Sequence, residues 1–239
     1  MSNFTEQVAF CLKAEGLTKS YGEKLALDHV SFQLNGGECL GIAGHNGSGK
    51  STLLSLISQT LMPDEGDLQL SGASVFGDRR FLREEVGYVP QQDGLLPELR
   101  VEEMLRSWQA LIQTEDAAAY QAAVELMGLS PLLRKKIAQL SGGMKKRVSI
   151  ALALLGKPKL LILDEVLSAL DRTYCESFLQ YIQNFVAAGG SVLYCTHQKD
   201  EMLQICDRLL ILKHGNVVFY DRIEALSAEA LLSDGLFSE

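Results

Sequence analysis

Hydrophobic and polar positions form short strand-like blocks near both ends of this 239-residue chain, with a helical pattern between them. Three apolar stretches bounded by Gly and Asn turns predict strands, namely VAFCLKAE (8–15), LDHVSFQL (27–34) and DLQLSG (67–72). ECLGIAG at 38–44 predicts another strand that runs directly into glycines, and STLLSLISQ at 51–59 predicts the helix after it. Pro63 and the acidic turn that it begins end this first unit.

From Val101 onward the apolar period changes to that of a helix, and one face collects Val101, Met104, Leu105, Trp108, Leu111 and Ile112. This stripe is either core or, for Met104 and Trp108, the lining of a groove for a partner. Thr114, followed by Glu115 and Asp116, predicts the cap and acidic first turn of a second helix that ends near Gly128. Pro131 begins a third short helical piece. An all-helical block therefore occupies about 95–145.

After this block the strand pattern returns, with KLLILDE (159–165), a long helix from Asp171, SVLYCT (191–196), a further helix and DRLLILK (207–213). Alternating strands and helices predict an α/β fold in which a mostly parallel sheet is covered on both faces. The acidic segment after Tyr220 is interpreted as a terminal amphipathic helix with a fraying end.

Charge and composition narrow the function classes. The net charge of −8 and the pI near 5.1 argue against a broad basic surface, so nucleic acid is not an expected partner. The five cysteines are scattered, which favours buried reduced thiols over a metal or redox site. Neither a signal peptide nor a membrane span is visible, so another chain is expected to supply any spanning part.

The segment GHNGSGKS at 44–51 fits the phosphate-loop pattern GxxxxGK[ST] and lies between a predicted strand and a predicted helix. Its glycines let backbone N–H groups approach phosphates, Lys50 neutralises β- and γ-phosphate charge, and the Ser51 hydroxyl can bind Mg²⁺. A plain glycine-rich turn is the alternative, and the strand–loop–helix context favours a nucleoside triphosphate site. The predicted contacts are Gly44, Asn46, Gly47, Ser48, Gly49, Lys50, Ser51 and Thr52.

Two later strand ends carry reactive side chains. KLLILDE ends in Asp164, which can hold Mg²⁺ through water, and in Glu165, which can polarise an attacking water. A strand that ends in Asp-Glu is otherwise often a surface turn, but ligands of open α/β sheets bind at this edge. His197, at the end of the next predicted strand, is either a structural residue or a sensor of the γ-phosphate.

LSGGMKKR at 140–147 places a hydroxyl residue and two glycines at the head of an apolar helical run. Ser141 is the predicted N-cap, and a helix N-terminus presents free N–H groups to an anion. Lys145, Lys146 and Arg147 oppose the helix dipole, so an anion is expected to face this end. These three cations either contribute to the positive electrostatic field that the anion meets or form a solvated helix face.

The chain resembles the ATP-binding cassette (ABC) ATPases that power membrane transporters, from about Ala9 to Tyr220. LSGGM is similar to the signature sequence of that family and follows the phosphate loop in the family's order. Tyr21, in KSYGEKLALDHVSF, matches the aromatic residue that stacks on adenine. Gln91, in VGYVPQQDG, matches the glutamine that links the core to the helical block, and LSALD (167–171) matches the segment after the catalytic strand.

This resemblance implies a RecA-like P-loop core with a small antiparallel β layer over about 1–94 and 146–220, a helical signature subdomain over about 95–145, and a tail over 221–239. It also implies ATP and Mg²⁺ as ligands: Gln91 joins Ser51 and Asp164 as a metal ligand, Glu165, His197 and Lys50 are catalytic, and Asp171 contributes to the nucleotide site.

The family's partners are implied in the same way. Two cassettes pair head to tail, so that Ser141, Gly142 and Gly143 of one chain close over the γ-phosphate held by the other. A homodimer, or a heterodimer with a related cassette, is expected when ATP is bound. Separate permease subunits would hold the protein at the cytoplasmic face of a membrane. The rival interpretation is a regulatory or scaffold cassette without transport.

The chain departs from the family's usual pattern at three places. Val166-Leu167 replaces a proline-containing pair, which is expected to loosen the turn that leads to Asp171. His45 stands where proline is common and is expected to have little effect. Met144 replaces the more frequent glutamine of the signature, which makes the chain look most like exporter cassettes.

Overall fold

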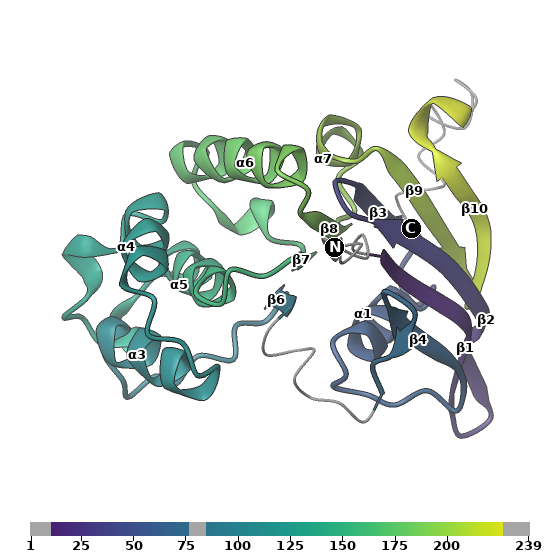
Figure 1. Cartoon of the computed structure of the whole chain (residues 1–239), viewed down its shortest axis with the longest axis horizontal. Helices are drawn as coiled ribbons and strands as arrows, with labels where there is room; N and C mark the ends of the chain where they lie inside the picture. Colours follow the sequence, from purple (N-terminus) through teal and green to yellow (C-terminus); the bar gives the residue numbers. More distant parts are fainter. Residues whose placement is uncertain (1–10, 77–84, 227–239) are drawn as a thin grey trace, which may run out of the picture.

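The computed structural model describes residues 11–76 and 85–226. A six-stranded sheet forms its centre, in the order β10-β9-β3-β8-β7-β6, and all neighbouring pairs are parallel except the edge pair β9/β10 (Figure 1). Its strands are β3 (Cys39–Ala43), β6 (Val86–Val89), β7 (Leu160–Asp164), β8 (Ser191–Cys195), β9 (Arg208–Lys213) and β10 (Asn216–Arg222). The mostly parallel sheet that the pattern predicts is confirmed.

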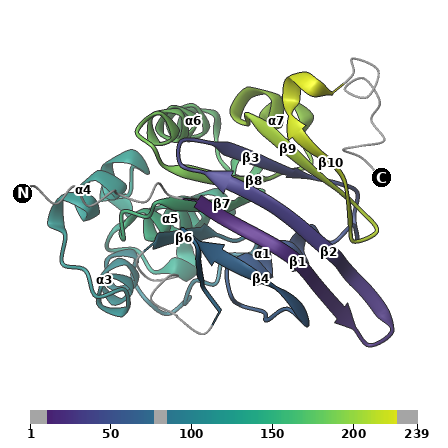
Figure 2. The ribbon, with the colours of Figure 1, turned by 45° about the vertical axis from the view of Figure 1, so that its right-hand side comes forward.

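A second, antiparallel sheet has the order β2-β1-β4-β5. It consists of β1 (Cys11–Tyr21), β2 (Lys24–Asn35), β4 (Glu65–Leu70) and β5 (Ala73–Ser74), and Figure 2 shows it lying over one side of the central sheet. The first predicted strand begins outside the described residues, and within them it continues six residues further than predicted, to Tyr21.

Two apolar cores hold these layers together, because successive residues of a strand point to opposite faces. Leu40 and Ile42 of β3 pack with α1 (Lys50–Ile57) and the antiparallel sheet. Cys39 and Ala43 of the same strand belong to the other core. That second core continues beneath α6 (Arg172–Ala187) and α7 (Lys199–Ile205) and into the helical block.

The helical block is a lobe beside the β7–β6 edge, seen on the left of Figure 1. It contains α3 (Val101–Leu111), α4 (Ala117–Leu126) and α5 (Gly142–Leu154), with single 3₁₀ turns at Ser130–Leu132 and Ile137–Gln139. The predicted stripe on α3 is confirmed at Val101, Met104 and Leu105, which are buried, but Leu111 is 65% exposed. The boundary expected near residue 146 falls inside α5, so this helix joins the block to the core.

The cap of α4 is Asp116 rather than Thr114, because the Asp116 carboxylate accepts the N–H of Ala119 at 2.9 Å. That carboxylate also forms an ion pair with Lys157, which lowers its pKa together with the backbone bond. Asp116 is the residue directly before Ala117, so its carboxylate reaches the free N–H groups of the first turn, whereas Thr114 lies two residues further from the helix.

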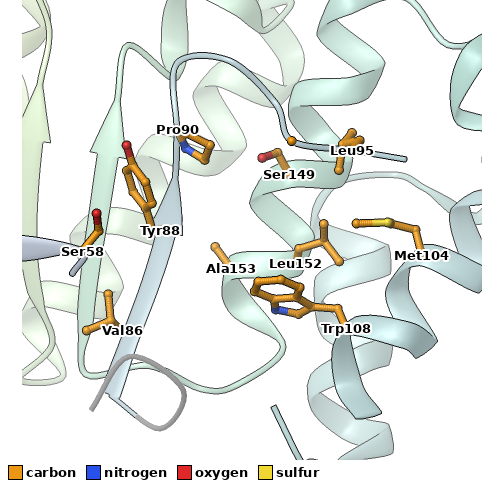
Figure 3. A pocket seen from close by; sticks show the side chains of 11 residues that line it. Ser58, Val86, Tyr88, Pro90, Leu95, Met104, Trp108, Ser149, Leu152 and Ala153 are labelled. Atoms are coloured by element: carbon orange, nitrogen blue, oxygen red, sulfur yellow. The ribbon is translucent and has the colours of Figure 1, made fainter. Parts of the chain in front are cut away.

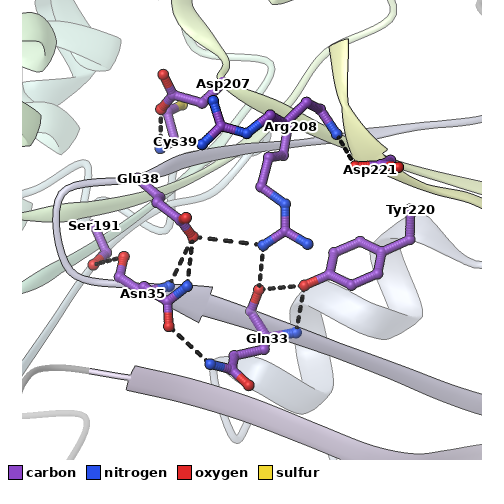
Figure 4. A network of polar contacts seen from close by, with 10 residues as sticks. Gln33, Asn35, Glu38, Cys39, Ser191, Asp207, Arg208, Tyr220 and Asp221 are labelled. Carbon is purple, nitrogen blue, oxygen red and sulfur yellow. Dashed lines mark hydrogen bonds and ion pairs between the residues drawn. The ribbon is translucent and has the colours of Figure 1, made fainter. Parts of the chain in front are cut away.

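The hairpin strand β10 was not predicted, although Val217 to Tyr220 form a short apolar run. A polar network ties its end to the antiparallel sheet (Figure 4). The Tyr220 hydroxyl contacts the backbone of Gln33 in β2, and the Arg208 guanidinium lies 4.3 Å from the Tyr220 ring centroid and forms an ion pair with Glu38. The terminal helix predicted for the tail lies outside the described residues from 227 on.

Among the described residues, no helix is both long and apolar enough to cross a membrane. Two further short 3₁₀ helices lie at Leu167–Ala169 and Ile223–Ala225.

Candidate nucleotide site

The predicted phosphate loop connects β3 to α1, and its glycines have the conformations that this connection needs. Gly44 and Gly49 have φ values of +142° and +111°, in a region that side chains rarely adopt. A Cβ at Gly44 would lie 2.3 Å from the carbonyl oxygen of Leu212, and one at Gly49 would lie 2.6 Å from that of Ala26. The loop therefore follows a path that only glycine permits, and α1 begins directly after it at Lys50.

A cleft of about 250 Å³ opens at this loop, and most of the predicted site residues line it. They are Tyr21, Asn46, Gly47, Gly49, Lys50, Ser51, Thr52, Gln91, Asp164 and Glu165. Gly44 lies at the start of the loop, where its carbonyl oxygen accepts a hydrogen bond from Lys50 Nζ, and Ser48 is buried behind the loop. Residues that are far apart in the chain thus form one polar cavity at the carboxyl ends of the parallel strands.

Three further residues line the cleft that sequence reasoning did not find: Lys24, Ala26 and Cys195. Lys24 and Ala26 lie at the start of β2, close to Tyr21, and Cys195 ends β8 opposite Asp164. None of them carries a local motif. Their places follow from strand pairing, which a single sequence does not display.

Asp164 and Glu165 leave β7 in different directions. Glu165 has a φ of +51°, a left-handed conformation that is uncommon outside glycine, and its N–H is held by the Cys195 carbonyl at 2.8 Å. Burial raises the pKa of the Asp164 carboxyl, and the neighbouring Glu165 charge raises it further. The Cys195 thiol, Lys146 and Lys50 act in the opposite direction. Asp164 is therefore a carboxylate that a cation in the cleft would stabilise.

Both carboxylate oxygens of Glu165 have polar partners on neighbouring loops. Gln91 Nε2 donates to Glu165 Oε2 at 2.6 Å, and His197 Nδ1 lies 3.1 Å from Oε1. The three side chains come from the ends of β6, β7 and β8, as the strand order predicts. This arrangement holds the Glu165 carboxylate at the cleft through two neighbouring loops.

The side chains at the cleft fit a hard divalent cation. The Ser51 hydroxyl, the Asp164 carboxylate and the Gln91 amide supply oxygen donors around one cavity, which is the ligand type that Mg²⁺ prefers. Gln91 directs its amide nitrogen to Glu165, so its amide oxygen is the atom that would face a metal.

The signature segment lies apart from this cleft. Ser141 caps α5 by accepting the N–H of Met144 at 3.3 Å, as predicted, and both Ser141 and its cap bond are exposed. A Cβ placed on Gly142 meets no atom outside its own helix within 4 Å, whereas one on Gly143 would lie 2.8 Å from the Ala169 carbonyl oxygen, so the helix N-terminus is open on the Gly142 side. Asp171 similarly caps α6 through the N–H of Tyr174 and does not line the cleft. One chain alone does not bring these residues to its own phosphate loop.

Two of the three cations after the signature are buried. Lys146 is 3% exposed and donates to the carbonyls of Pro90 and Gln91. Arg147 is 7% exposed and donates to the carbonyls of Met127 and Gly128. The solvated-face interpretation was wrong for this pair, because the two side chains bind backbone carbonyls inside the fold, and a contribution of their charges to the field at the helix end stays a prediction. Only Lys145 is partly exposed.

The expected loosening at Val166-Leu167 is absent. Val166 is completely buried and belongs to the core, Leu167 is 3% exposed, and the Leu170 N–H bonds to the Leu167 carbonyl at 3.0 Å. An apolar pair therefore orders this turn by burial, where proline would order it by restricting φ. His45 is on the outer side of the loop, where its ring lies edge-on to that of His214.

A separate groove of about 280 Å³ lies between β6, α5 and α3 (Figure 3). Its wall is mostly apolar and includes Val86, Tyr88, Met104, Trp108 and Leu152. Met104 is buried and Trp108 is half-buried, so the core alternative for the α3 stripe is confirmed at Met104, and a partner in the groove stays a prediction. The stripe packs into the core and also lines an open groove that begins at Pro90, next to Gln91.

The five cysteines are all free thiols, and Cys39, Cys195 and Cys206 are buried as expected. Cys11 and Cys175 are only partly buried. Burial raises the pKa of the Cys39 and Cys195 thiols, which keeps them protonated.

Residues 27–168 match the family model described as ABC transporter, which is more than half of the chain. This chain belongs to the ABC transporter family. It is 34% identical over 226 residues to the Nod factor export ATP-binding protein I of Sinorhizobium fredii, covering 93% of this chain and 66% of that protein. The chain spans about two thirds of the length of the curated relatives that it matches.

Solved structures agree with this family membership. The ATP-binding subunit of an ABC transporter superposes with a TM-score of 0.85 at 27% identity, covering 92% of this chain and 97% of that one. A dimeric post-hydrolysis ATP-binding cassette bound to ADP and Pi superposes with a TM-score of 0.80 at 27% identity, covering 90% of this chain and 100% of that one. The resemblance to ABC ATPases and the RecA-like P-loop fold are therefore confirmed.

Proposed function

We propose that this ABC cassette is the nucleotide-binding subunit of a transporter, in which ATP joins two cassettes and hydrolysis separates them again. One observation carries this proposal. The N-terminus of the signature helix is open at Gly142, and it does not line the nucleotide cleft of its own chain. Free N–H groups at that end suit a phosphate, and a second cassette would supply one. The dimeric cassette that retains ADP and Pi supports this assembly.

Within the cleft, each side chain has a distinct task. The Tyr21 ring, 53% exposed at the edge, stacks on adenine, while the loop N–H groups and Lys50 hold the phosphates. Lys50 Nζ now contacts the carbonyls of Gly44 and His45, and a β- or γ-phosphate would draw it toward the cleft. Glu165 accepts a proton from the attacking water, with Gln91 and His197 keeping its carboxylate in place.

Ser51, Asp164 and Gln91 would hold Mg²⁺ with the nucleotide. When bound, the ion neutralises charge on the β- and γ-phosphates. The partner cassette completes the site with its Ser141, Gly142 and Gly143, and Asp171 contributes nearby. Two such sites would form in a homodimer or in a heterodimer with a related cassette.

Separate permease subunits would bind in the groove between β6, α5 and α3, which places the cassette at the cytoplasmic face of a membrane. The apolar wall and its continuity with the Gln91 loop support this, because a helix seated there would touch the loop that reaches Glu165. The Sinorhizobium relative, named as an export protein, supports export as the direction.

The dimer is tested by light scattering of three proteins with ATP and Mg²⁺. Wild-type protein is expected to return to monomer as ATP is consumed, whereas Glu165→Gln retains the binding residues and accumulates as an ATP-bound dimer. Adding Gly142→Asp places a carboxylate against the partner's γ-phosphate, where like charges in a desolvated gap cost several kcal/mol. The open space at Gly142 means that this change does not disturb the isolated chain. If the double variant still dimerises, the signature segment of one cassette does not face the nucleotide of the other.

The groove is tested with Trp108→Glu, matched by Leu111→Glu on the exposed face of the same helix. The Trp108 variant is expected to lose co-purification with a permease chain that is expressed together with it, and the Leu111 variant is expected to keep it. If neither change affects a permease complex, the groove is not its docking site. If only soluble partners bind, the regulatory or scaffold function replaces transport.

A further inference from the structure

Lys146 lies one turn beyond the signature glycines on α5, and its side chain is only 4% exposed. Its Nζ donates to the backbone carbonyls of Pro90 at 2.7 Å and Gln91 at 2.9 Å, and it lies 2.9 Å from the Asp93 carboxylate. The ammonium thus donates two hydrogen bonds to carbonyls and is neutralised by one carboxylate. This buried charge is therefore paired.

The two carbonyls and the carboxylate all belong to one loop, residues 90–93, which follows β6. A buried cation costs free energy unless it is neutralised and hydrogen-bonded, so Lys146 and this loop depend on each other. Lys146 has no exposed atoms to offer a partner's phosphate. Its position links the signature helix to the Gln91 loop.

The link continues to Glu165. Lys146 holds the main chain of Gln91 at its carbonyl oxygen, while the side chain of the same residue donates to Glu165 Oε2 at 2.6 Å. A shift of α5 would therefore displace the residue that holds the catalytic carboxylate. Misplacement of a reacting group by about 1 Å can cost about a hundredfold in rate.

We propose that Lys146 is a positioning residue that couples the signature helix to Glu165 through the Gln91 loop. Hydrolysis is then fastest when the helix has the orientation that closure over a partner's nucleotide requires. This inference rests on the roles proposed above for Gln91 and Glu165. Lys146 does not line the cleft, so we assign its effect on the hydrolysis rate to its hold on Gln91.

The chemistry at this position favours lysine. Glutamine would keep two N–H donors but lose the charge, which leaves the buried Asp93 carboxylate without its counter-ion. Arginine keeps the charge, but its planar fork does not match two carbonyls and a carboxylate grouped around one nitrogen. Lys146→Arg is therefore expected to restore part of the activity that Lys146→Gln loses.

The test is single-turnover hydrolysis of ATP by the full chain with Mg²⁺, with nucleotide affinity measured in parallel. Lys146→Gln is expected to lower the hydrolysis rate by roughly ten- to a hundredfold while ATP affinity stays within about twofold of wild type. Lys13→Gln removes an exposed lysine that pairs with Glu15 on the antiparallel sheet and serves as the matched control, with an unchanged rate.

The same change is then made in a Gln91→Ala background. If Lys146 acts through Gln91, Lys146→Gln lowers the rate by less than about twofold there, because the coupling is already broken. A purely structural role would give the same loss in both backgrounds and would overturn the inference, as would an unchanged rate in the single variant. If Lys146→Gln does not fold, Asp93→Asn takes its place. Asp93→Asn is expected to lower the hydrolysis rate by a smaller factor, and this loss must also vanish in the Gln91→Ala background.

Glu165→Gln separates this inference from the proposed function. A Glu165→Gln protein that hydrolyses ATP like wild type would refute the role of Glu165 itself. An inactive Glu165→Gln protein together with an additive Lys146→Gln effect would refute only the coupling.

Discussion

Arg147→Met provides the sharpest test of how the signature helix is anchored. Arg147 Nε donates to the Met127 carbonyl at 2.7 Å and Nη2 donates to the Gly128 carbonyl at 2.6 Å. Its guanidinium carbon lies 3.6 Å from the Tyr174 ring centroid. One side chain thus joins α5 to the C-terminus of α4 and to the first turn of α6.

The loss of stability follows from these contacts. Each hydrogen bond from a charged donor contributes about 1.5–3 kcal/mol, and a desolvated cation–π contact contributes about 2 kcal/mol. The sum of these contact energies is an upper bound on the loss of stability. Methionine avoids the cost of burying a guanidinium, which is several kcal/mol. We expect Arg147→Met to lower the free energy of unfolding by about 2–4 kcal/mol, within the range of broken buried networks.

Urea unfolding measures this loss. Trp108 is the single tryptophan of the chain and lies in the helical block, so its fluorescence reports the region that Arg147 anchors, while far-UV circular dichroism reports the whole chain. Arg172→Met is the control: that arginine is 92% exposed and pairs only with Glu176 on its own helix, so its loss should cost less than about 0.5 kcal/mol. If the two variants unfold at the same urea concentration, Arg147 does not anchor the helix.

Three further predictions concern the cleft. Lys50→Ala should abolish tight ATP binding, because the β/γ-phosphates lose their counter-charge, and wild-type affinity by calorimetry would contradict the phosphate-loop assignment. Tyr21→Ala should weaken ATP binding by roughly 1–3 kcal/mol while Tyr21→Phe is tolerated, and equal affinity of both would mean that adenine binds elsewhere. The pKa of Asp164 is raised above 3.8, so the folded carboxyl keeps its proton where the unfolded one has lost it, and its contribution to stability falls as pH rises. Nucleotide-free Asp164→Asn should therefore be more stable than wild type near about pH 7, with the gain shrinking toward about pH 4, and a gain independent of pH would contradict this.

The sequence alone determined the parts of the site that depend on local chemistry. The glycine-rich loop between strand and helix can be recognised in the sequence, because its backbone conformations require glycine at positions such as Gly44 and Gly49. The strand ending in Asp164 and Glu165 could be placed at the same edge because parallel strands share one direction. Ser141 as a cap was equally local, since a hydroxyl bonds within its own first turn.

Only the tertiary structure decided the roles that depend on what a side chain meets across the fold. Lys145, Lys146 and Arg147 are consecutive cations with the same local pattern, yet only the last two are buried, because the Gln91 loop and the end of α4 present carbonyls to them. Lys24 and Cys195 line the cleft for a similar reason, since strand pairing brings them there. Val166 orders its turn by packing into the core rather than by any restriction of its own backbone. Local pattern indicates what a residue can do, and the partners that decide what it does come from distant segments of the chain, 74 positions apart for Gln91 and Glu165.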